Sequence, residues 1–184
     1  MMFIVNINKS VILTYLGIIF AMIGMYFSFT KIAFVEINYL RYSLIFLMLA
    51  GICDMFDGKV ARMCKRTKEE KEFGIQLDSL ADTVNFLCLP VVIMLSLGMN
   101  SIIELVIYCL FVLCGVSRLG YFNVHASLDN PVKFYNGLPV TSTAIVYPVA
   151  GLLHGNIPDC TFKTILIVLT VLVSILFVFK VKVP

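Results

Sequence analysis

Residues 52–86 read ICDMFDGKVARMCKRTKEEKEFGIQLDSLADTVNF and hold four of the six aspartates in this 184-residue chain: Asp54, Asp57, Asp78 and Asp82. The first two are three residues apart and the last two are four apart, so each pair shares one face of a helix. Two such helices side by side would bring four carboxylates together. Oxygen ligands of this kind suit a hard cation such as Mg²⁺ or Mn²⁺, which can hold a phosphate-bearing substrate.

The rest of the chain is strongly apolar. Hydrophobic residues make up 60% of it, and the mean hydropathy is +0.99. A soluble domain of this length does not need so much apolar sequence, so we predict an integral membrane protein. Ionisable groups at membrane depth are costly, which makes the four aspartates a functional hypothesis by default. The basic residues cluster in one loop rather than along a face, which argues against a nucleic-acid partner.

Six apolar stretches have about the length that crosses a bilayer. The predicted spans are Val11–Phe29, Ile37–Cys53, Ile75–Leu97, Ile102–Leu119, Leu138–Leu153 and Thr164–Phe179. The second is expected to continue through Asp54–Arg62 as one helix that leaves the membrane. We therefore expect residues 1–184 to form a single all-α, membrane-embedded catalytic domain with six transmembrane helices.

Basic residues set the orientation expected for these spans. In this layout eleven of the fourteen lysines and arginines fall on one side of the membrane and three on the other. Cytoplasmic loops carry the excess of Lys and Arg, so both ends of the chain and the aspartates are predicted to face the cytoplasm. The expected location is the cytoplasmic membrane.

Small residues accompany the acids on the same helix faces. Gly58, Ala61 and Arg62 follow Asp54 at i+4, i+7 and i+8, and Gly74 lies one turn before the second pair of acids. Gly inside a helix costs about 1 kcal/mol relative to Ala, so a packing or binding reason is expected. Gly58 and Ala61 leave room for a flat group against the helix, and a guanidinium can fork onto phosphate oxygens.

A small transporter or channel with an acidic cation path is the alternative from another functional class. It predicts acids spread through the membrane depth. The four aspartates instead gather at one end of two helices, beside a basic loop.

The chain resembles the CDP-alcohol phosphotransferases, whose signature it carries as DxxDGxxAR at residues 54–62 and GxxxDxxxD at 74–82. The resemblance implies a six-span membrane enzyme, usually a homodimer, that displaces CMP from a CDP-linked lipid or alcohol. The stretch Met63–Phe73 is a few residues longer than the family's usual spacer. Its extra charged residues, Lys65–Glu72, are expected to form a longer cytoplasmic turn that leaves the site intact.

Flanking residues are similar to one branch of the family, the phosphatidylserine synthases. Residues 73–82 read FGIQLDSLAD, and RLGYFN at 118–123 and FYNGLP at 134–139 resemble further segments of that branch. This implies transfer of the phosphatidyl group from CDP-diacylglycerol to L-serine, giving phosphatidylserine and CMP. Glycerol 3-phosphate or inositol phosphate stays open as the acceptor, and an archaeal-type ether lipid stays open as the donor.

The resemblance also implies roles for single residues. The expected ligands of Mg²⁺ or Mn²⁺ are Asp54, Asp57, Asp78 and Asp82. Of these, Asp82 would also be the base that takes the proton from the serine hydroxyl. The expected CDP-lipid-binding residues are Asp54, Gly58, Ala61, Arg62, Gly74 and Asp78. Arg118 and Asn123 would contact the acceptor or the lipid phosphate.

Overall fold

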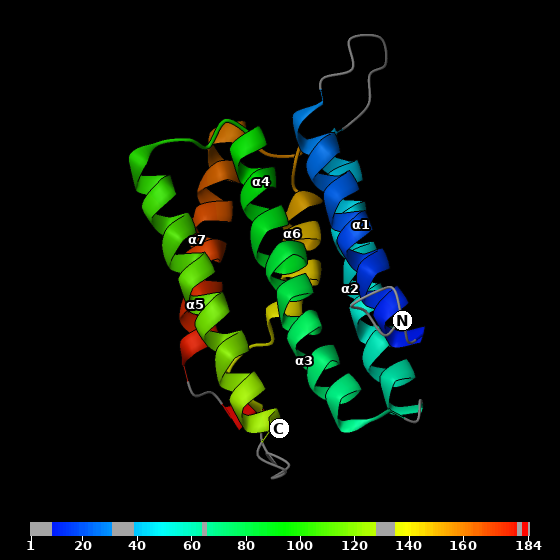
Figure 1. Ribbon diagram of the computed structural model, residues 1–184. Coiled ribbons are helices and arrows are strands. Elements are labelled where there is room, and N and C mark those ends of the chain that lie inside the picture. Colours follow the sequence, from blue (N-terminus) through cyan, green and yellow to red (C-terminus); the bar gives the residue numbers. More distant parts are fainter. Residues whose placement is uncertain (1–8, 31–38, 64–65, 128–134, 180–181, 184) are drawn as a thin grey trace.

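The computed structural model describes residues 9–30, 39–63, 66–127, 135–179 and 182–183, and in this part of the chain six helical rods form one up-and-down bundle (Figure 1). The helices are α1 (Lys9–Phe29), α2 (Tyr39–Met63), α3 (Lys68–Asp82), α4 (Leu89–Ser96), α5 (Ile102–Ser127), α6 (Thr143–Gly151) and α7 (Asp159–Val178). A π-helical turn, η1 (Thr83–Cys88), joins α3 and α4 into one rod, and a 3-10 turn, η2 (Val140–Ser142), leads into α6. Two short strands, β1 (Tyr135–Asn136) and β2 (Lys182–Val183), pair antiparallel.

The predicted all-α membrane fold with six helices is confirmed. Among the described residues, four helices are long and apolar enough to cross a membrane by length and composition. They are Val11–Phe29, Lys68–Ser96, Ile102–Val124 and Asp159–Val178. The apolar helix Val140–Gly151 is shorter. For that helix and for α2, the membrane crossing stays a prediction.

The start of α3 corrects the expected charged turn. Lys65–Glu72 was predicted to be a longer turn, but α3 already begins at Lys68. A capping box explains the difference: the Glu70 amide donates to Thr67 Oγ1 (3.2 Å), and the Thr67 amide donates to the Glu70 carboxylate (2.9 Å). These two bonds satisfy amides that the first helical turn leaves unpaired. Residues 68–72 therefore lengthen a helix instead of a loop, while Lys65 lies outside the described residues.

Two further boundaries affect the site. The helix α2 runs through the first acid pair to Met63, as predicted, although the expected start of that span at Ile37 lies outside the described residues. The helix α5 continues to Ser127, about two turns past the expected end at Leu119. Arg118 and Asn123 therefore lie on one continuous helix.

Small residues let the rods approach one another closely. A side chain at Gly115 of α5 would overlap Leu87, and one at Gly151 would overlap Leu44 of α2. Close approach at glycine is how helices pack in membranes, where van der Waals contact drives association. The core is built around the α3–α4 rod, in which Leu87 and Phe86 are fully buried.

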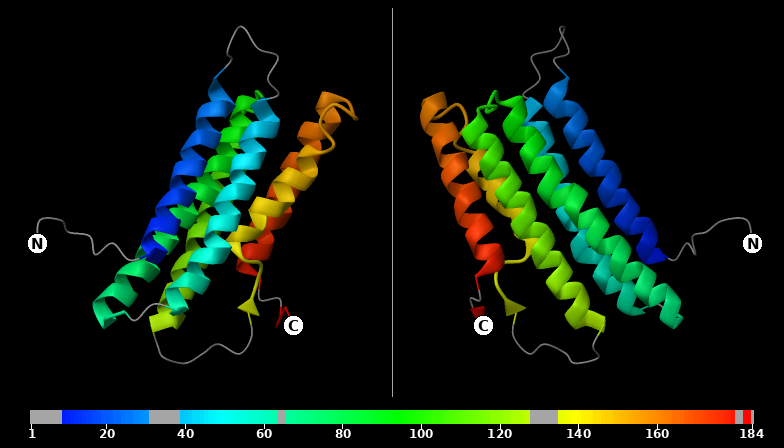
Figure 2. Two further views of the ribbon diagram at one scale, coloured as in Figure 1. Left: turned by 90° about the vertical axis from the view of Figure 1, so that its right-hand side faces the viewer. Right: turned by 60° about the vertical axis from the view of Figure 1, so that its left-hand side comes forward.

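One end of the bundle gathers the segments that carry the signature. The start of α1, the end of α2, the start of α3 and the ends of α5 and α7 all lie at this end (Figures 1 and 2). Contacts of α1 with both α2 and α3 fix these three helices relative to one another. The two aspartate-bearing faces are thus held opposite each other by the packing of the bundle.

Candidate active site

Three carboxylates converge where α2 faces α3. Asp54 of α2 and Asp78 and Asp82 of α3 each offer an oxygen within 4.8 Å of the others. Asp54 and Asp82 are close enough for a side-chain hydrogen bond, and Asp82 is only 8% exposed. Oxygens bound to one Mg²⁺ at about 2.1 Å lie at most about 4.2 Å apart, so small rotations of these carboxylates would close the set around an ion. The three residues therefore fit a divalent cation.

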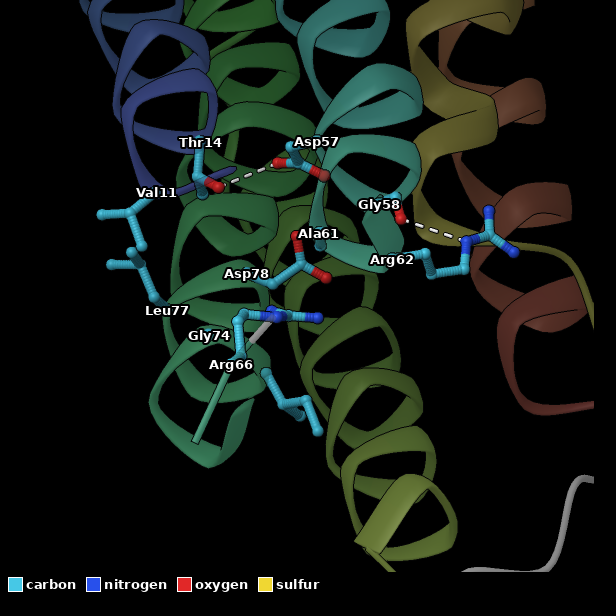
Figure 3. A pocket seen from close by; sticks show the side chains of 11 residues that line it. Val11, Thr14, Asp57, Gly58, Ala61, Arg62, Arg66, Gly74, Leu77 and Asp78 are labelled. Atoms are coloured by element: carbon cyan, nitrogen blue, oxygen red, sulfur yellow. Dashed lines mark hydrogen bonds between the residues drawn. The ribbon is translucent and has the colours of Figure 1, made fainter. Parts of the chain in front are cut away.

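Asp57 stands apart from this group and has a different partner. Its carboxylate accepts a hydrogen bond from Thr14 Oγ1 of α1 at 2.9 Å, and both side chains are buried (Figure 3). The four expected metal ligands thus divide into a group of three and a fourth acid tied to α1. Sequence reasoning missed Thr14, because a single hydroxyl in an apolar helix carries no spacing that would mark it.

A pocket of about 350 Å³ opens beside the acids, between α1, α2 and α3. Five of the six residues expected to bind the CDP-lipid line it: Gly58, Ala61, Arg62, Gly74 and Asp78. The sixth, Asp54, adjoins the pocket through its contact with Asp78 in the carboxylate group. Spacing in the sequence therefore identified residues that the fold brings to one cavity.

The α2 wall of the pocket is bare. Apart from its chain neighbours and the adjoining backbone of its own helix, no atom lies within 4 Å of the position that a Cβ on Gly58 would take. This glycine is therefore not needed for helix packing, unlike Gly115 and Gly151. Since glycine weakens a helix, an open wall that admits a ligand gives a physical reason for its presence.

Two arginines at the pocket point in different directions. Arg62, the arginine of the signature, is exposed, and its Nε donates to the Gly58 carbonyl at 3.1 Å, so its guanidinium turns away from the acids (Figure 3). Arg66 is half-buried and lies at the pocket beside Gly74. The sequence marked Arg66 only as one charge of a basic loop.

Arg118 is engaged with backbone carbonyls. Its Nη2 donates to Gly137 O at 2.8 Å and its Nε to Leu138 O at 3.1 Å, while the guanidinium lies 4.0 Å from the ring centroid of Phe122. The side chain is 5% exposed and is not among the residues that line the pocket. In the structure it connects α5 to the turn that precedes α6.

Gly137 is essential to this turn. Its φ of +84° lies in the left-handed region, and a Cβ there would come within 3.0 Å of the Phe179 carbonyl at the end of α7. Only glycine meets both conditions without strain. The turn at Gly137 and Leu138 therefore connects α5 to the end of α7.

Asn123, the second residue expected to contact the acceptor, pairs with the signature helix. Its Oδ1 accepts a hydrogen bond from Ser79 Oγ at 2.8 Å. Ser79 lies next to Asp78 and one turn before Asp82 on α3, so this pair stands beside the acids on the α5 side. An acceptor role for Asn123 stays a prediction.

The chain belongs to the CDP-alcohol phosphatidyltransferase family, whose sequence model matches residues 8–176. A CDP-diacylglycerol–serine O-phosphatidyltransferase of Saccharomyces cerevisiae is 37% identical over 131 residues, which cover 64% of this chain and 46% of that protein. One of the same name from Helicobacter pylori is 31% identical over 137 residues, covering 72% and 56%. An archaetidylserine synthase of Methanothermobacter thermautotrophicus is 35% identical over 102 residues, covering 55% and 42%.

These relatives confirm the resemblance seen in residues 54–82. The chain spans about half the length of the relatives it matches here. No solved structure matches it.

Replacing Arg118 with Gln should lower the stability of the bundle. Hydrogen bonds to a charged group contribute about 1.5–3 kcal/mol, and the variant leaves two carbonyls without their guanidinium partner. Thermal unfolding of the purified protein in detergent should show a lower midpoint for Arg118→Gln. The exposed Arg62→Gln variant is the control and should melt like the unaltered protein. An unchanged midpoint together with lost substrate binding would contradict the structural role.

Proposed function

We propose that this chain is a CDP-diacylglycerol–serine O-phosphatidyltransferase, which transfers the phosphatidyl group to L-serine and releases CMP. The observation that carries the proposal is the group of three carboxylates, Asp54, Asp78 and Asp82, beside a pocket with a bare helix wall. Two of the relatives described above bear this name. The residues that resemble the synthase branch, above all Ser79 after Asp78, support serine as the acceptor.

The three carboxylates would hold one or two Mg²⁺ or Mn²⁺ ions, with Asp57 as a further ligand at the edge of the pocket. When bound, such a cation neutralises the pyrophosphate of the donor and the charge that develops on the leaving CMP. The bare wall at Gly58 and Ala61 would receive the nucleotide. This arrangement orients the pyrophosphate towards the acids.

Asp82 is the proposed base. It would accept the proton of the serine hydroxyl as the serine oxygen bonds to the lipid-bearing phosphorus and the bond from that phosphorus to CMP breaks. In an in-line displacement the acceptor enters opposite the leaving group. The nucleotide pocket lies between α1, α2 and α3, so the α5 side, where Asn123 meets Ser79, is the proposed entrance for serine.

The proposed setting is the cytoplasmic membrane, with the site facing the cytoplasm. The excess of basic residues on the signature side of the predicted layout supports this orientation. The pocket also lies at the bundle end where α1 starts and α7 ends, which agrees with both ends of the chain on that side. A homodimer is proposed on the family resemblance alone, and a single catalytic domain over residues 1–184 is proposed from the layout of the apolar spans.

Two alternatives concern the substrates within the same chemistry. Glycerol 3-phosphate or inositol phosphate could replace serine as the acceptor, and the relative named archaetidylserine synthase raises an ether lipid as the donor. The transporter alternative loses its support, because the chain belongs to a family of transferases and its acids gather at one end of the bundle.

Product analysis tests the proposed function directly. Purified protein in detergent is given CDP-diacylglycerol and Mn²⁺ with serine, glycerol 3-phosphate or inositol phosphate in turn. CMP release and phosphatidylserine should appear with serine, and removal of the metal with EDTA should abolish both. A different lipid product would reassign the acceptor. No CMP release with any of the three would sink the proposal.

The Asp82→Asn variant separates proton transfer from substrate binding. The amide has the shape of the carboxylate but cannot take the serine proton, so turnover should fall by about 10²–10⁴-fold. Binding of CDP-diacylglycerol in the presence of Mn²⁺ should largely survive. Parallel loss of binding would mean that Asp82 acts through the metal alone.

The Gly58→Ala variant should gain stability and lose affinity. Alanine favours the helix by about 1 kcal/mol, and no neighbouring atom opposes its methyl group. The same methyl group would occupy the wall proposed for the nucleotide and weaken CDP-diacylglycerol binding. Gly120→Ala in α5 is the matched control, since no atom lies within 4 Å there either. It should gain stability with unchanged binding. If both variants bind CDP-diacylglycerol with equal affinity, the nucleotide does not lie against Gly58.

A further inference from the structure

Arg66 lies outside the family signature, in the stretch that is longer than the usual spacer. It nevertheless lines the nucleotide pocket together with Gly74 and Asp78. Its Nη1 lies 3.1 Å from the position that a Cβ on Gly74 would take. Figure 3 shows its guanidinium below Asp78, among the side chains that line the pocket. The lack of a side chain at Gly74 makes room for this arginine.

The local structure holds Arg66 in this place. The next residue, Thr67, is the N-cap of α3, with extended backbone and both hydrogen bonds of the capping box. These bonds fix the direction in which the chain enters the helix. Arg66 directly precedes this N-cap, and its side chain is half-buried at the pocket.

The guanidinium stands near acids without pairing with them. Lys163 and Asp159 form the one ion pair within 4.0 Å among the described residues. Arg66 therefore forms no ion pair with Asp78 at that distance. A cation held by the acids and a phosphate bound to that cation would fill the space between. The phosphate oxygens would then contact the cation on one side and the Arg66 guanidinium on the other. A planar guanidinium can bind phosphate oxygens through two parallel hydrogen bonds.

We propose that Arg66 binds the pyrophosphate of the CDP-linked lipid in the pocket, and that Gly74 admits its guanidinium. This inference rests on the proposed function and adds a phosphate ligand from outside the signature. It also distinguishes the two arginines. Arg62 is held by the carbonyl of its own helix, whereas Arg66 faces the space in which the pyrophosphate would lie.

Binding measurements on Mn²⁺-loaded protein in detergent test the proposal. Arg66→Gln should weaken binding of CDP-diacylglycerol and CDP by about tenfold or more, because a charged hydrogen bond contributes about 1.5–3 kcal/mol and each 1.4 kcal/mol or so is a factor of ten. Competition by cytidine, which has no phosphate, should be unchanged. Arg66→Lys should recover part of the affinity, because it keeps the charge but not the fork. Lys68→Gln, an exposed charge two residues further on, is the matched control and should bind like the unaltered protein.

Gly74→Ala provides an independent test of the same contact. Its methyl group would crowd the guanidinium and shift it by a few tenths of an ångström, so CDP affinity should fall in the unaltered background, by less than in Arg66→Gln. In the Arg66→Gln background the methyl group has no guanidinium to displace, and the additional loss should disappear. Such non-additivity is the expected behaviour of residues in direct contact.

Each contrary result has a clear meaning. Unchanged CDP affinity in Arg66→Gln, or an equal loss in Lys68→Gln, would overturn the role of Arg66 while leaving the proposed function standing. Additive losses from Gly74→Ala and Arg66→Gln would overturn the proposed contact between them. Failure of the unaltered protein to bind CDP-diacylglycerol would overturn the proposed function and this inference together.

Discussion

The rest of the site depends on three carboxylates that the bundle holds within 4.8 Å of one another. Two ionised carboxylates at that distance repel by about 3 kcal/mol at an effective dielectric constant of about 20, and three form three such pairs. Free side chains would move apart, but α2 and α3 are both packed against α1. The fold therefore favours any ligand that neutralises the acids, and a bound cation would stabilise the junction of α2 and α3 by mass action.

Helix α1 also contributes to the site. Thr14 donates to Asp57, which faces the pocket from α2 while the other three acids form their own group. That hydroxyl gives the Asp57 carboxylate, which is only 6% exposed, a hydrogen-bond partner on a second helix. The pocket is thus lined by two acids, Asp57 and Asp78, by Gly58 and Ala61 on α2, and by Arg66.

The sequence predicted what depends on helical spacing. The shared faces of the acids, Gly58 and Ala61 follow from periodicity, and the structure brings these residues to one cavity. Contacts between distant segments could not be predicted in this way. Thr14 is 43 residues from Asp57, and Arg118 meets carbonyls 19 and 20 residues further on. The helical start at Lys68 was missed for another reason: the capping signal T-x-x-E was present, but the run of charges masked it.

The wide turn η1 separates the acidic end of the α3–α4 rod from its buried core. At the end of α3, Asp78 and Asp82 face Asp54 of α2. In η1, the next turn of the rod, Phe86 and Leu87 are fully buried. Phe86 follows Asp82 on the side that faces α2, because its ring lies 3.8 Å from the position that a Cβ on Gly51 of α2 would take. A π-helical turn holds more residues than an α-helical turn. The residues after it are therefore rotated about the helix axis relative to an uninterrupted α-helix. Leu87 then fits the gap left by Gly115 on α5. One rod can thus be polar towards α2 at one end and tightly packed against α5 in the core.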